Sequence, residues 1–316
     1  MEDVVIGVDI GGTNTAIGLV DKNGTVLADS NLKTTAFAEV NDFVDALSKE
    51  FTSLVANKYK LKAIGIGAPN GNYNRGTIEN APNLGWPGII PFTEMLEKKT
   101  GVKAVLTNDA NAAALGEQLF GGAKGMKDFF VFTLGTGLGS GIVVDGNVVY
   151  GYTGFAGECG HIIMEPEGRQ CNCGRKGCLE QYVSAPGIVT TVKLLLKEKG
   201  NKSMLADIEP GSLTSKLIAE AAAGGDALAL EAFDYTAEML ARAIANTAVV
   251  TSPEAVFLFG GLANAGDLLL APVKKYFDRY IFPLLQNRVK ILLSGIQEDN
   301  AAVLGSAALA WKEQGH

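Results

Sequence analysis

Short apolar runs that end at glycine-rich turns are the clearest pattern along this chain of 316 residues. The first run covers residues 4–9 and ends at Gly11 and Gly12, and a second run covers residues 16–20. Polar residues at 21–24 then supply a turn. β-Branched residues favour strands and glycine permits a tight reversal, so the pattern predicts a hairpin with a glycine tip.

The same plan returns at residues 129–145, where an apolar run, a glycine-rich tip and a second apolar run follow one another. Gly11 corresponds to Gly135 and Asp21 to Asp145 at one constant offset. We therefore expect a duplicated unit of strand, glycine turn and strand.

Helical spacing of apolar residues appears in several longer segments. It predicts helices at residues 43–59, 110–119, 185–199, 213–223, 227–250 and 301–312, with further strands at 63–68, 104–106 and 255–259. Alternating strands and helices are typical of α/β layering, and the hairpins make the sheets mixed. The length suggests about two domains of ~150 residues each. We expect the change of domain near residues 117–122.

Composition narrows the class of protein. Apolar residues make up 47% and charged residues 19% of the chain, as in ordinary soluble globular proteins. A net charge of −7 repels a phosphate backbone, so no nucleic-acid partner is expected. The chain opens with Glu2 and Asp3, and no uncharged apolar run reaches the ~18 residues of a membrane span. We expect a cytoplasmic protein with reduced thiols and no membrane partner.

The first glycine tip has two interpretations. Backbone amides at Gly11 and Gly12 can face an anion, and Thr13 and Asn14 can add donors to phosphate oxygens. The alternative is a plain hairpin turn. Asp9 favours the first interpretation, because a carboxylate at the end of a buried strand needs a reason such as a Mg²⁺ ion or its water shell.

The second tip, around Thr136 and Gly137, is equally ambiguous alone, but two tips in a repeated unit suggest opposed clamps on one polyphosphate. A third turn, at Gly260 and Gly261, can let an adenine ring lie against the backbone, or it is a plain strand-to-helix turn. The sequence contains neither a P-loop nor a His-Arg-Asp catalytic loop. Any phosphoryl transfer therefore belongs to another class of enzyme.

Asn108 and Asp109 lie between a predicted strand and an alanine-rich helix. Asp109 suits a helix N-cap, which is the ordinary role of an aspartate in this position. It also suits a base that accepts the proton of an attacking hydroxyl, with Asn108 holding a neighbouring hydroxyl. In phosphoryl transfer the position of such a base matters more than its pKa.

All four cysteines and one of the two histidines lie close together in the sequence. His161, Cys171, Cys173 and Cys178 provide one nitrogen and three sulfurs, the donor set of a closed tetrahedral zinc site. Four protein ligands leave no open position, so we expect structural Zn²⁺ rather than catalytic Zn²⁺. Cys159 is left over and is expected to be a small buried thiol.

Two glutamates flank this cluster. Glu158 lies three residues before His161 and Glu180 two residues after Cys178, so both are held rigidly and suit sugar hydroxyls. Ordinary surface glutamates are the alternative. His161 can bind zinc through one ring nitrogen and donate from the other to a substrate oxygen.

Together these residues resemble the ROK family of sugar kinases and repressors, most closely its bacterial ATP-dependent glucokinases. The resemblance covers nearly the whole chain and rests on residues 9–13, 108–109, 134–141, 158–161 and 171–180. It implies an actin-like ATPase (ribonuclease H-like) fold, with two α/β domains and mixed sheets around a central cleft. The implied domains are 1–117 plus 299–316, and 118–298 with the zinc site.

The resemblance also implies roles for individual residues. ATP and Mg²⁺ would bind between the tips at Gly12–Asn14 and Thr136–Gly137, with adenine near Gly260 and Gly261. The implied sugar contacts are Gly71, Asn83, Asn108, Asp109, Glu158, His161 and Glu180. Asp109 would be the base for the 6-hydroxyl, and the zinc ligands would be His161, Cys171, Cys173 and Cys178.

The implied activity is phosphorylation of glucose to glucose 6-phosphate by a homodimer. Three alternatives stay open: another acceptor such as N-acetylmannosamine, N-acetylglucosamine, fructose or allose; polyphosphate as the donor; and a sugar-responsive repressor. The repressor is less expected because that branch carries a helix-turn-helix before the first glycine tip. Here the first predicted strand begins almost at Met1.

Overall fold

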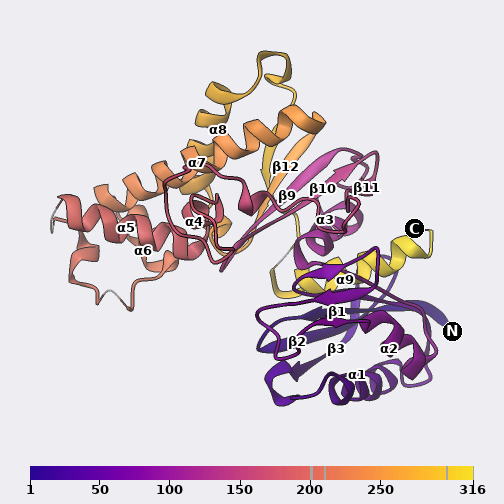
Figure 1. The fold of residues 1–316 in the computed structure, drawn as a ribbon. Coiled ribbons are helices and arrows are strands. Elements are labelled where there is room, and N and C mark those ends of the chain that lie inside the picture. The colour runs from indigo at the N-terminus through magenta and orange to yellow at the C-terminus, as the bar shows by residue number, and fades with distance from the viewer. Residues whose placement is uncertain (200–201, 210, 297, 316) are drawn as a thin grey trace.

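The computed structural model describes residues 1–199, 202–209, 211–296 and 298–315. Two five-stranded mixed sheets dominate the fold (Figure 1). The first has the order β3-β2-β1-β4-β8 and consists of β1 (Glu2–Ile10), β2 (Asn14–Val20), β3 (Val26–Lys33), β4 (Tyr59–Gly67) and β8 (Ala104–Thr107). β1 is antiparallel to β2 and parallel to β4, and β4 is parallel to β8.

The second sheet repeats this plan strand for strand. Its order is β11-β10-β9-β12-β13, with β9 (Phe129–Leu134), β10 (Leu138–Val144), β11 (Asn147–Val148), β12 (Ala255–Phe259) and β13 (Lys290–Leu293). β9 is antiparallel to β10 and parallel to β12, as β1 is to β2 and β4. The predicted duplication is therefore confirmed.

The predicted constant offset is wrong beyond the tips. Ile10 pairs with Thr15 across the first tip, whereas Leu134 pairs with Leu138 across the second. The second tip is thus one residue shorter, and the offset between the two units changes by one from the first strand to the second. Sequence alignment without a gap cannot reveal this difference, because apolar residues occupy both strands in either register.

Both faces of β1 are covered, which explains its continuous apolar run. Ile6 and Val8 pack with Phe43 of α1 (Val40–Val55) and Phe92 of α2 (Phe92–Thr100). Val5 points to the other face, toward Ala307 and Trp311 of α9 (Glu298–Glu313), as the alternation of strand side chains requires. The Trp311 indole also donates to the carbonyl of Asp21 at 3.0 Å.

Two helices lie between the sheets. Ala114 of α3 (Asp109–Phe120) packs with Phe129 and Val131 of β9 and with Leu309 of α9. Figure 1 shows α3 against the second sheet and α9 against the first. Such a pair of central helices fixes how the two sheets sit relative to each other.

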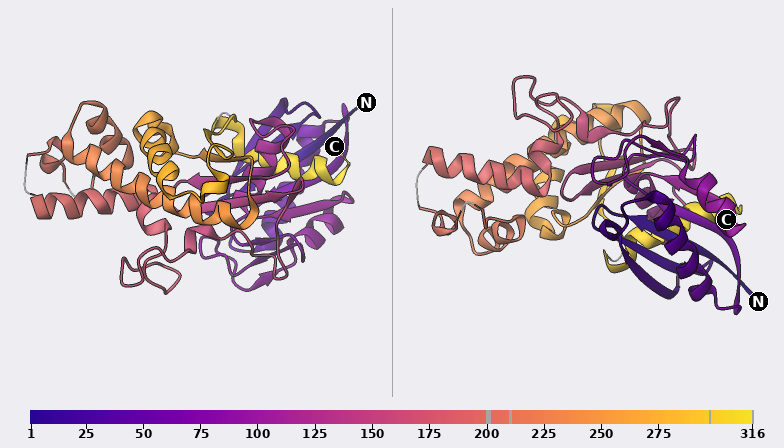
Figure 2. Two further views of the ribbon diagram at one scale, coloured as in Figure 1. Left: turned by 90° about the horizontal axis from the view of Figure 1, so that it is seen from above. Right: turned by 60° about the horizontal axis from the view of Figure 1, so that its bottom comes forward.

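The outer face of the second sheet carries most of the remaining helices. They are α4 (Glu180–Val183), α5 (Ala185–Lys199), α6 (Ser215–Ala223), α7 (Ala227–Thr251) and α8 (Asp267–Tyr280). Figure 2 shows them extending away from the first sheet. Phe233 and Leu240 of α7 are fully buried in the largest apolar cluster, with Phe132 of β9. None of the helices in the described residues is both long and apolar enough to span a bilayer.

Some elements differ from the predictions. α1 ends at Val55, before the predicted residue 59, because Ala56 and Asn57 take positive φ angles of 46° and 57°. α2 and α8 were not predicted, and neither was a small third sheet with the order β5-β6-β7, formed by β5 (Gly71–Asn72), β6 (Thr77–Glu79) and β7 (Ile89–Ile90). The predicted boundary at residue 117 falls inside α3. The division into two domains there stays a prediction.

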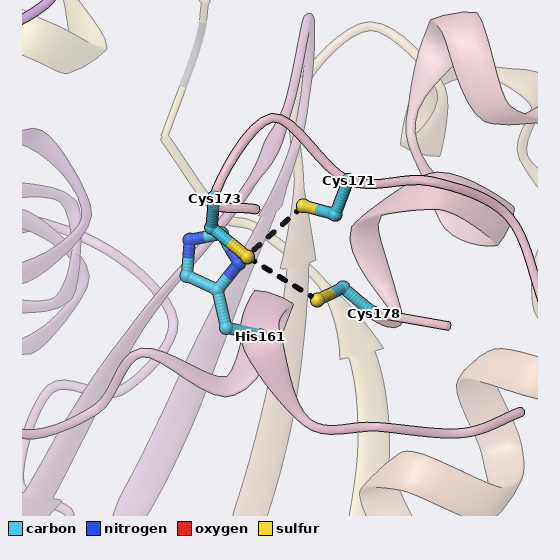
Figure 3. Close-up of side chains that lie close together, drawn as sticks. All are labelled: His161, Cys171, Cys173 and Cys178. Atoms are coloured by element: carbon cyan, nitrogen blue, oxygen red, sulfur yellow. Dashed lines mark hydrogen bonds between the residues drawn. The ribbon is translucent and has the colours of Figure 1, made fainter. Parts of the chain in front are cut away.

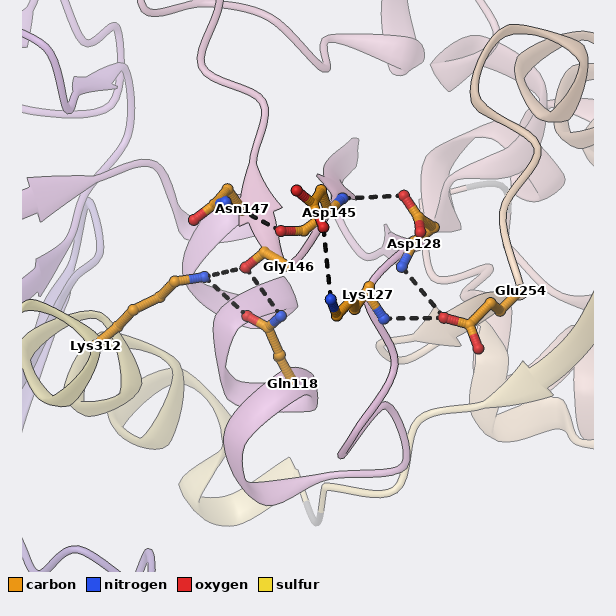
Figure 4. Close-up of polar contacts among 8 residues, drawn as sticks. All are labelled: Gln118, Lys127, Asp128, Asp145, Gly146, Asn147, Glu254 and Lys312. Atoms are coloured by element: carbon orange, nitrogen blue, oxygen red, sulfur yellow. Dashed lines mark hydrogen bonds and ion pairs between the residues drawn. The ribbon is translucent and has the colours of Figure 1, made fainter. Parts of the chain in front are cut away.

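Polar contacts tie the end of α9 to the second sheet (Figure 4). The Lys312 ammonium donates to the Gln118 side chain at 3.1 Å and to the carbonyl of Gly146 in the β10–β11 turn. Burial lowers the pKa of Lys312. Asp145 of the same turn donates its amide to the Asp128 carboxylate at 3.0 Å, and Glu254 accepts from the amide of the neighbouring Lys127 at 2.9 Å.

A buried carboxylate joins the chain segments that cross between the sheets. Glu117 is 1% exposed, and its oxygens accept from the amide of Gly122 at 2.6 Å, the amide of Gly295 at 2.9 Å and the hydroxyl of Ser294 at 2.6 Å. Gly122 lies on the way from α3 to β9, and Ser294 and Gly295 lie on the way from β13 to α9. One side chain therefore fixes both connections.

Replacement of this carboxylate tests its contribution. Glu117→Ala leaves three partly buried donors without their acceptor, and we expect the free energy of unfolding to fall by about 1–3 kcal/mol. Chemical denaturation measures the change. Glu94→Ala, which removes an exposed carboxylate paired with Lys98 on α2, is the control and should leave the midpoint nearly unchanged. Equal midpoints for the two variants would contradict the role of Glu117.

Candidate active site

Carboxylates gather at one edge of the first sheet. Asp9 is the last residue but one of β1, and Asp109 follows Asn108 directly after the end of β8. Because β1, β4 and β8 are parallel, their carboxyl ends share this edge. Burial and the charge of Asp109 together raise the pKa of Asp9 to about 6. The two aspartates thus lie within reach of each other's charge.

The N-cap of α3 is Asn108 and not Asp109. The Asn108 side-chain oxygen accepts from the amide of Asn111 at 2.7 Å, as an N-cap does. Asp109 is the first residue of the helix, and its side chain accepts from the adjacent amide of Ala110 at 2.8 Å. Its carboxylate stays open to solvent on one side, and the protein on the other sides raises its pKa. The N-cap interpretation of Asp109 is therefore wrong.

The second half of the chain brings two glutamates to the same place. Burial raises the pKa of Glu158, the charges of Asp109 and Glu180 raise it further, and His161 and Asn108 lower it. Ser140 of β10 supports this glutamate, since its hydroxyl accepts from the amide of Cys159 at 3.0 Å and donates to the carbonyl of Gly157. Four predicted sugar contacts from distant parts of the sequence therefore lie together around Glu158.

Glu180 lies between the cysteine cluster and the second glycine tip. One carboxylate oxygen accepts from the amide of Leu138 at 3.1 Å, and the other lies 3.8 Å from the sulfur of Cys171. A methyl group at Gly137 would come within 2.5 Å of the first oxygen, so the tip needs glycine there. The sequence offered no sign that Glu180 supports this tip.

The first tip closes with a bond from the amide of Gly11 to the carbonyl of Asn14 at 3.0 Å. Thr13 and Asn14 are exposed and free to meet a ligand from solvent. Asn83 lies beside this tip, because a methyl group at Gly12 would come within 2.6 Å of its carbonyl oxygen.

Gly71 lies beside Thr107, two residues before Asp109, which the sequence suggests as a base. A methyl group at Gly71 would come within 2.4 Å of the carbonyl oxygen of Thr107, which is followed by Asn108 and Asp109. Gly71 and Asn83 therefore lie on the same edge of the first sheet as Asp9 and Asp109.

The third turn lies beside the second tip. The amide of Leu262 donates to the carbonyl of Leu134 at 3.1 Å, and Gly260, with a φ of 98°, packs against the same carbonyl. Thr136 and Gly261 are exposed. A groove of about 560 Å³ opens here, lined in part by Gly260 and Asn264. Its size and its place at the strand ends suit a flat ring.

His161, Cys171, Cys173 and Cys178 converge in space as predicted (Figure 3). Their ligand atoms all lie within 4.8 Å of one another, with 3.6 Å between the sulfurs of Cys173 and Cys178 and 3.9 Å from Cys171 to Nδ1 of His161. Sulfurs at ~2.3 Å from a tetrahedral ion would be about 3.8 Å apart, so the cluster fits such an ion. Cys159 lies outside the cluster and is 6% exposed, which confirms a buried thiol.

The raised pKa of Asp9 predicts how the stability of the protein without ligands depends on pH. Its pKa of about 6 exceeds the usual 3.8, so the folded protein holds this proton more tightly than the unfolded chain. Asp9 therefore costs stability as the pH rises through 4 to 6. Without divalent cations, Asp9→Asn should raise the free energy of unfolding at pH 7.5 by about 1–3 kcal/mol and change little at pH 4.

Denaturation curves at both pH values check this prediction, with Asp29→Asn on the exposed strand β3 as the control. A loss of stability at pH 7.5 in the Asp9 variant would contradict the raised pKa of Asp9, which burial and the charge of Asp109 produce.

Comparison with known proteins agrees with this geometry. The model of the ROK family matches residues 5–313. A glucokinase of Halalkalibacterium halodurans is 36% identical, with 98% of this chain and 95% of that protein covered. The crystal structure of a ROK family glucokinase from Streptomyces griseus, in complex with glucose and AMPPNP, is 34% identical with a TM-score of 0.79, and the match covers 98% of this chain and 99% of that chain.

A second similar structure is a ROK family transcriptional regulator, a homologue of the E. coli MLC protein. It is 27% identical with a TM-score of 0.87, and the match covers 98% of this chain and 78% of that chain. Solved ROK sugar kinases have the actin-like ATPase fold, and this chain shares it, as predicted. The chain belongs to the ROK family.

Proposed function

We propose that this protein is an ATP-dependent sugar kinase that phosphorylates the 6-hydroxyl of a hexose, with glucose as the acceptor. The observation that carries the proposal is the position of the Asp109 carboxylate, which leaves the N-cap to Asn108 and lies within reach of the charges of Asp9 and Glu158. Glucokinases among its relatives, one of them with bound glucose and AMPPNP, support the choice of substrates.

In the proposed reaction, Asn108, Glu158, His161 and Glu180 hold the sugar hydroxyls, with Gly71 and Asn83 beside them. Asp109 accepts the proton of the 6-hydroxyl as its oxygen bonds to the γ-phosphorus and the bond from that phosphorus to the oxygen of ADP breaks. Burial raises the pKa of this carboxyl group, which makes its carboxylate a stronger base. Amides and side chains of Gly12, Thr13, Asn14, Thr136 and Gly137 would hold the phosphates, and adenine would lie in the groove at Gly260 and Gly261.

Mg²⁺ suits the edge of the first sheet, because the carboxylates of Asp9 and Asp109 lie there within reach of each other's charge and carboxylate oxygens are the ligands that Mg²⁺ prefers. Asp9 would hold the ion or its water shell. When bound, Mg²⁺ neutralises charge on the transferred phosphate.

Replacement of Asp109 tests the proposed base. Asp109→Asn should lower kcat for glucose phosphorylation by about 10²–10⁴-fold, because proton acceptance is lost, while glucose still binds. A coupled assay and calorimetry measure the two effects. Glu158→Gln is the comparison: it should act chiefly on KM for glucose. Wild-type kcat in the Asp109 variant would refute its role as base.

We also propose that the His161 cluster holds one structural Zn²⁺. Cys178→Ser should lose the zinc and lower Tm, whereas Cys159→Ser, which changes a thiol outside the cluster, should keep it. Elemental analysis and thermal unfolding of the purified proteins measure both. A wild-type protein that is fully stable after exhaustive chelation and contains no zinc would contradict the proposal.

The transcriptional regulator with a TM-score of 0.87 makes sugar sensing the second candidate function. ATP-dependent turnover of a sugar supports the kinase, whereas salt-sensitive, sequence-specific DNA binding without turnover supports the regulator. Within the kinases, kcat/KM for glucose, fructose, allose and the N-acetyl sugars separates the acceptors. The homodimer stays a prediction from the family resemblance, and the cytoplasmic location stays a prediction from the pattern of charged and apolar residues.

A further inference from the structure

The loop of residues 149–157, here called the bridging loop, connects β11 to Glu158. It leaves the second sheet and lies against the small third sheet, which belongs to the first half of the chain. Three contacts join the two: Asn72 with Thr153, Asn74 with Gly151, and the ring of Tyr73 with the ring of Tyr150. The position of Glu158 therefore depends on a contact between the two halves of the protein.

Asn72 is the buried member of these contacts. It is 0% exposed, and its side-chain NH₂ group donates both protons, one to the carbonyl of Thr153 at 2.9 Å and one to a carboxylate oxygen of Glu79 at 3.0 Å. Both partners are acceptors, so the amide cannot be turned around. An asparagine NH₂ group suits this position because it supplies two donors in one plane.

The other half of the Asn72 amide has no hydrogen bond. Its carbonyl oxygen is buried without a partner, and Gly154 presses against it so closely that a methyl group there would come within 2.2 Å. An unpaired buried carbonyl destabilises the fold, and few persist in native proteins. This cost is set against the two hydrogen bonds of the NH₂ group, which join Glu79 to the bridging loop.

Neighbouring contacts hold the rest of the loop. The rings of Tyr73 and Tyr150 stack at 4.1 Å and 6°, and the Tyr73 hydroxyl donates to Glu313 of α9 at 2.6 Å. At its far end the loop returns to β10, where Ser140 binds Gly157 and Cys159. Glu158 thus lies between two anchored points.

Asn72 is also close to the proposed base. It follows Gly71, which packs against the carbonyl of Thr107. Thr107 in turn leads directly into Asn108 and Asp109. The short strand β5 therefore lies between the two, because Gly71 contacts Thr107 near Asp109 and Asn72 contacts the bridging loop that leads to Glu158.

We propose that Asn72 is a positioning residue that sets Glu158 relative to Asp109 by holding the bridging loop through the carbonyl of Thr153. This inference rests on the proposed hexose kinase activity for its effect on catalysis, but its effect on the loop is independent of that activity.

The test compares three full-length variants with the wild type. Asn72→Asp keeps the shape but replaces the two donors by an acceptor that faces Glu79 and Thr153. Gly154→Ala disturbs the same contact from the side of the loop. Asn74→Ala is the matched control, because it removes an exposed hydrogen bond from the same hairpin to the same loop.

Two readouts are used. Hydrogen exchange by mass spectrometry should show faster exchange at residues 149–158 in both test variants, with β12 unchanged. Kinetics should show a hexose KM that rises about ten-fold or more, equivalent to ~1.4 kcal/mol, while KM for ATP changes by less than about two-fold. The control should resemble the wild type in both readouts, since water replaces an exposed bond.

Unchanged exchange at residues 149–158 in Asn72→Asp would overturn the inference. So would a lower Tm with wild-type hexose KM, which is the signature of a purely structural asparagine, or equal effects of the Asn72 and Asn74 variants. A wild-type protein without hexose kinase activity would refute the proposed function instead, and the exchange data would still decide whether Asn72 holds the loop.

Discussion

Repulsion between carboxylates is the constraint on which the rest of this structure depends. Burial raises the pKa of both Asp9 and Glu158, the charge of Asp109 raises both further, and Glu180 adds to the effect on Glu158. These groups come from two halves of the chain that would separate if nothing held them together. Carboxylates held this close together are stabilised when a divalent cation neutralises them or when the hydroxyl groups of a substrate donate hydrogen bonds to them.

The scaffold meets this constraint at several levels. The central helices α3 and α9 pack between the sheets, and Glu117 binds both chain segments that cross from one half to the other. On the side of the site, Asn72 and the Tyr73–Tyr150 stack hold the loop that leads to Glu158. Glu180 is fixed by the amide of Leu138 and lies beside the sulfur of Cys171. The cysteine cluster is therefore linked to the second glycine tip through a single carboxylate.

The sequence predicts those parts of the fold and site that depend on local pattern. Alternating apolar runs and glycine tips give the two hairpins and their duplication, and the spacing from His161 to Cys178 predicts the cluster. Patterns of this kind act within a few residues, so they predict neither the one-residue difference between the tips nor the small third sheet, whose strands are only two or three residues long. Pro272 lies inside α8, and because proline normally argues against a helix interior, the sequence does not predict this helix.

Other features depend on contacts between distant segments and leave no local signal. Asn72 is an ordinary asparagine in the sequence, and only the approach of Thr153 and Gly154 makes it notable. The sequence leaves the N-cap of α3 open, because asparagine and aspartate suit that position equally. The backbone decides between them: Asn108 has extended angles and Asp109 is already helical.

A crystal structure of the protein with glucose and a non-hydrolysable ATP analogue tests the central claim most directly. We predict the 6-oxygen of glucose within hydrogen-bond distance of the Asp109 carboxylate, other hydroxyls on Glu158 and Glu180, and the γ-phosphate between the two glycine tips. A sugar that binds without contact to Asp109, or a nucleotide outside the two tips, would contradict the account.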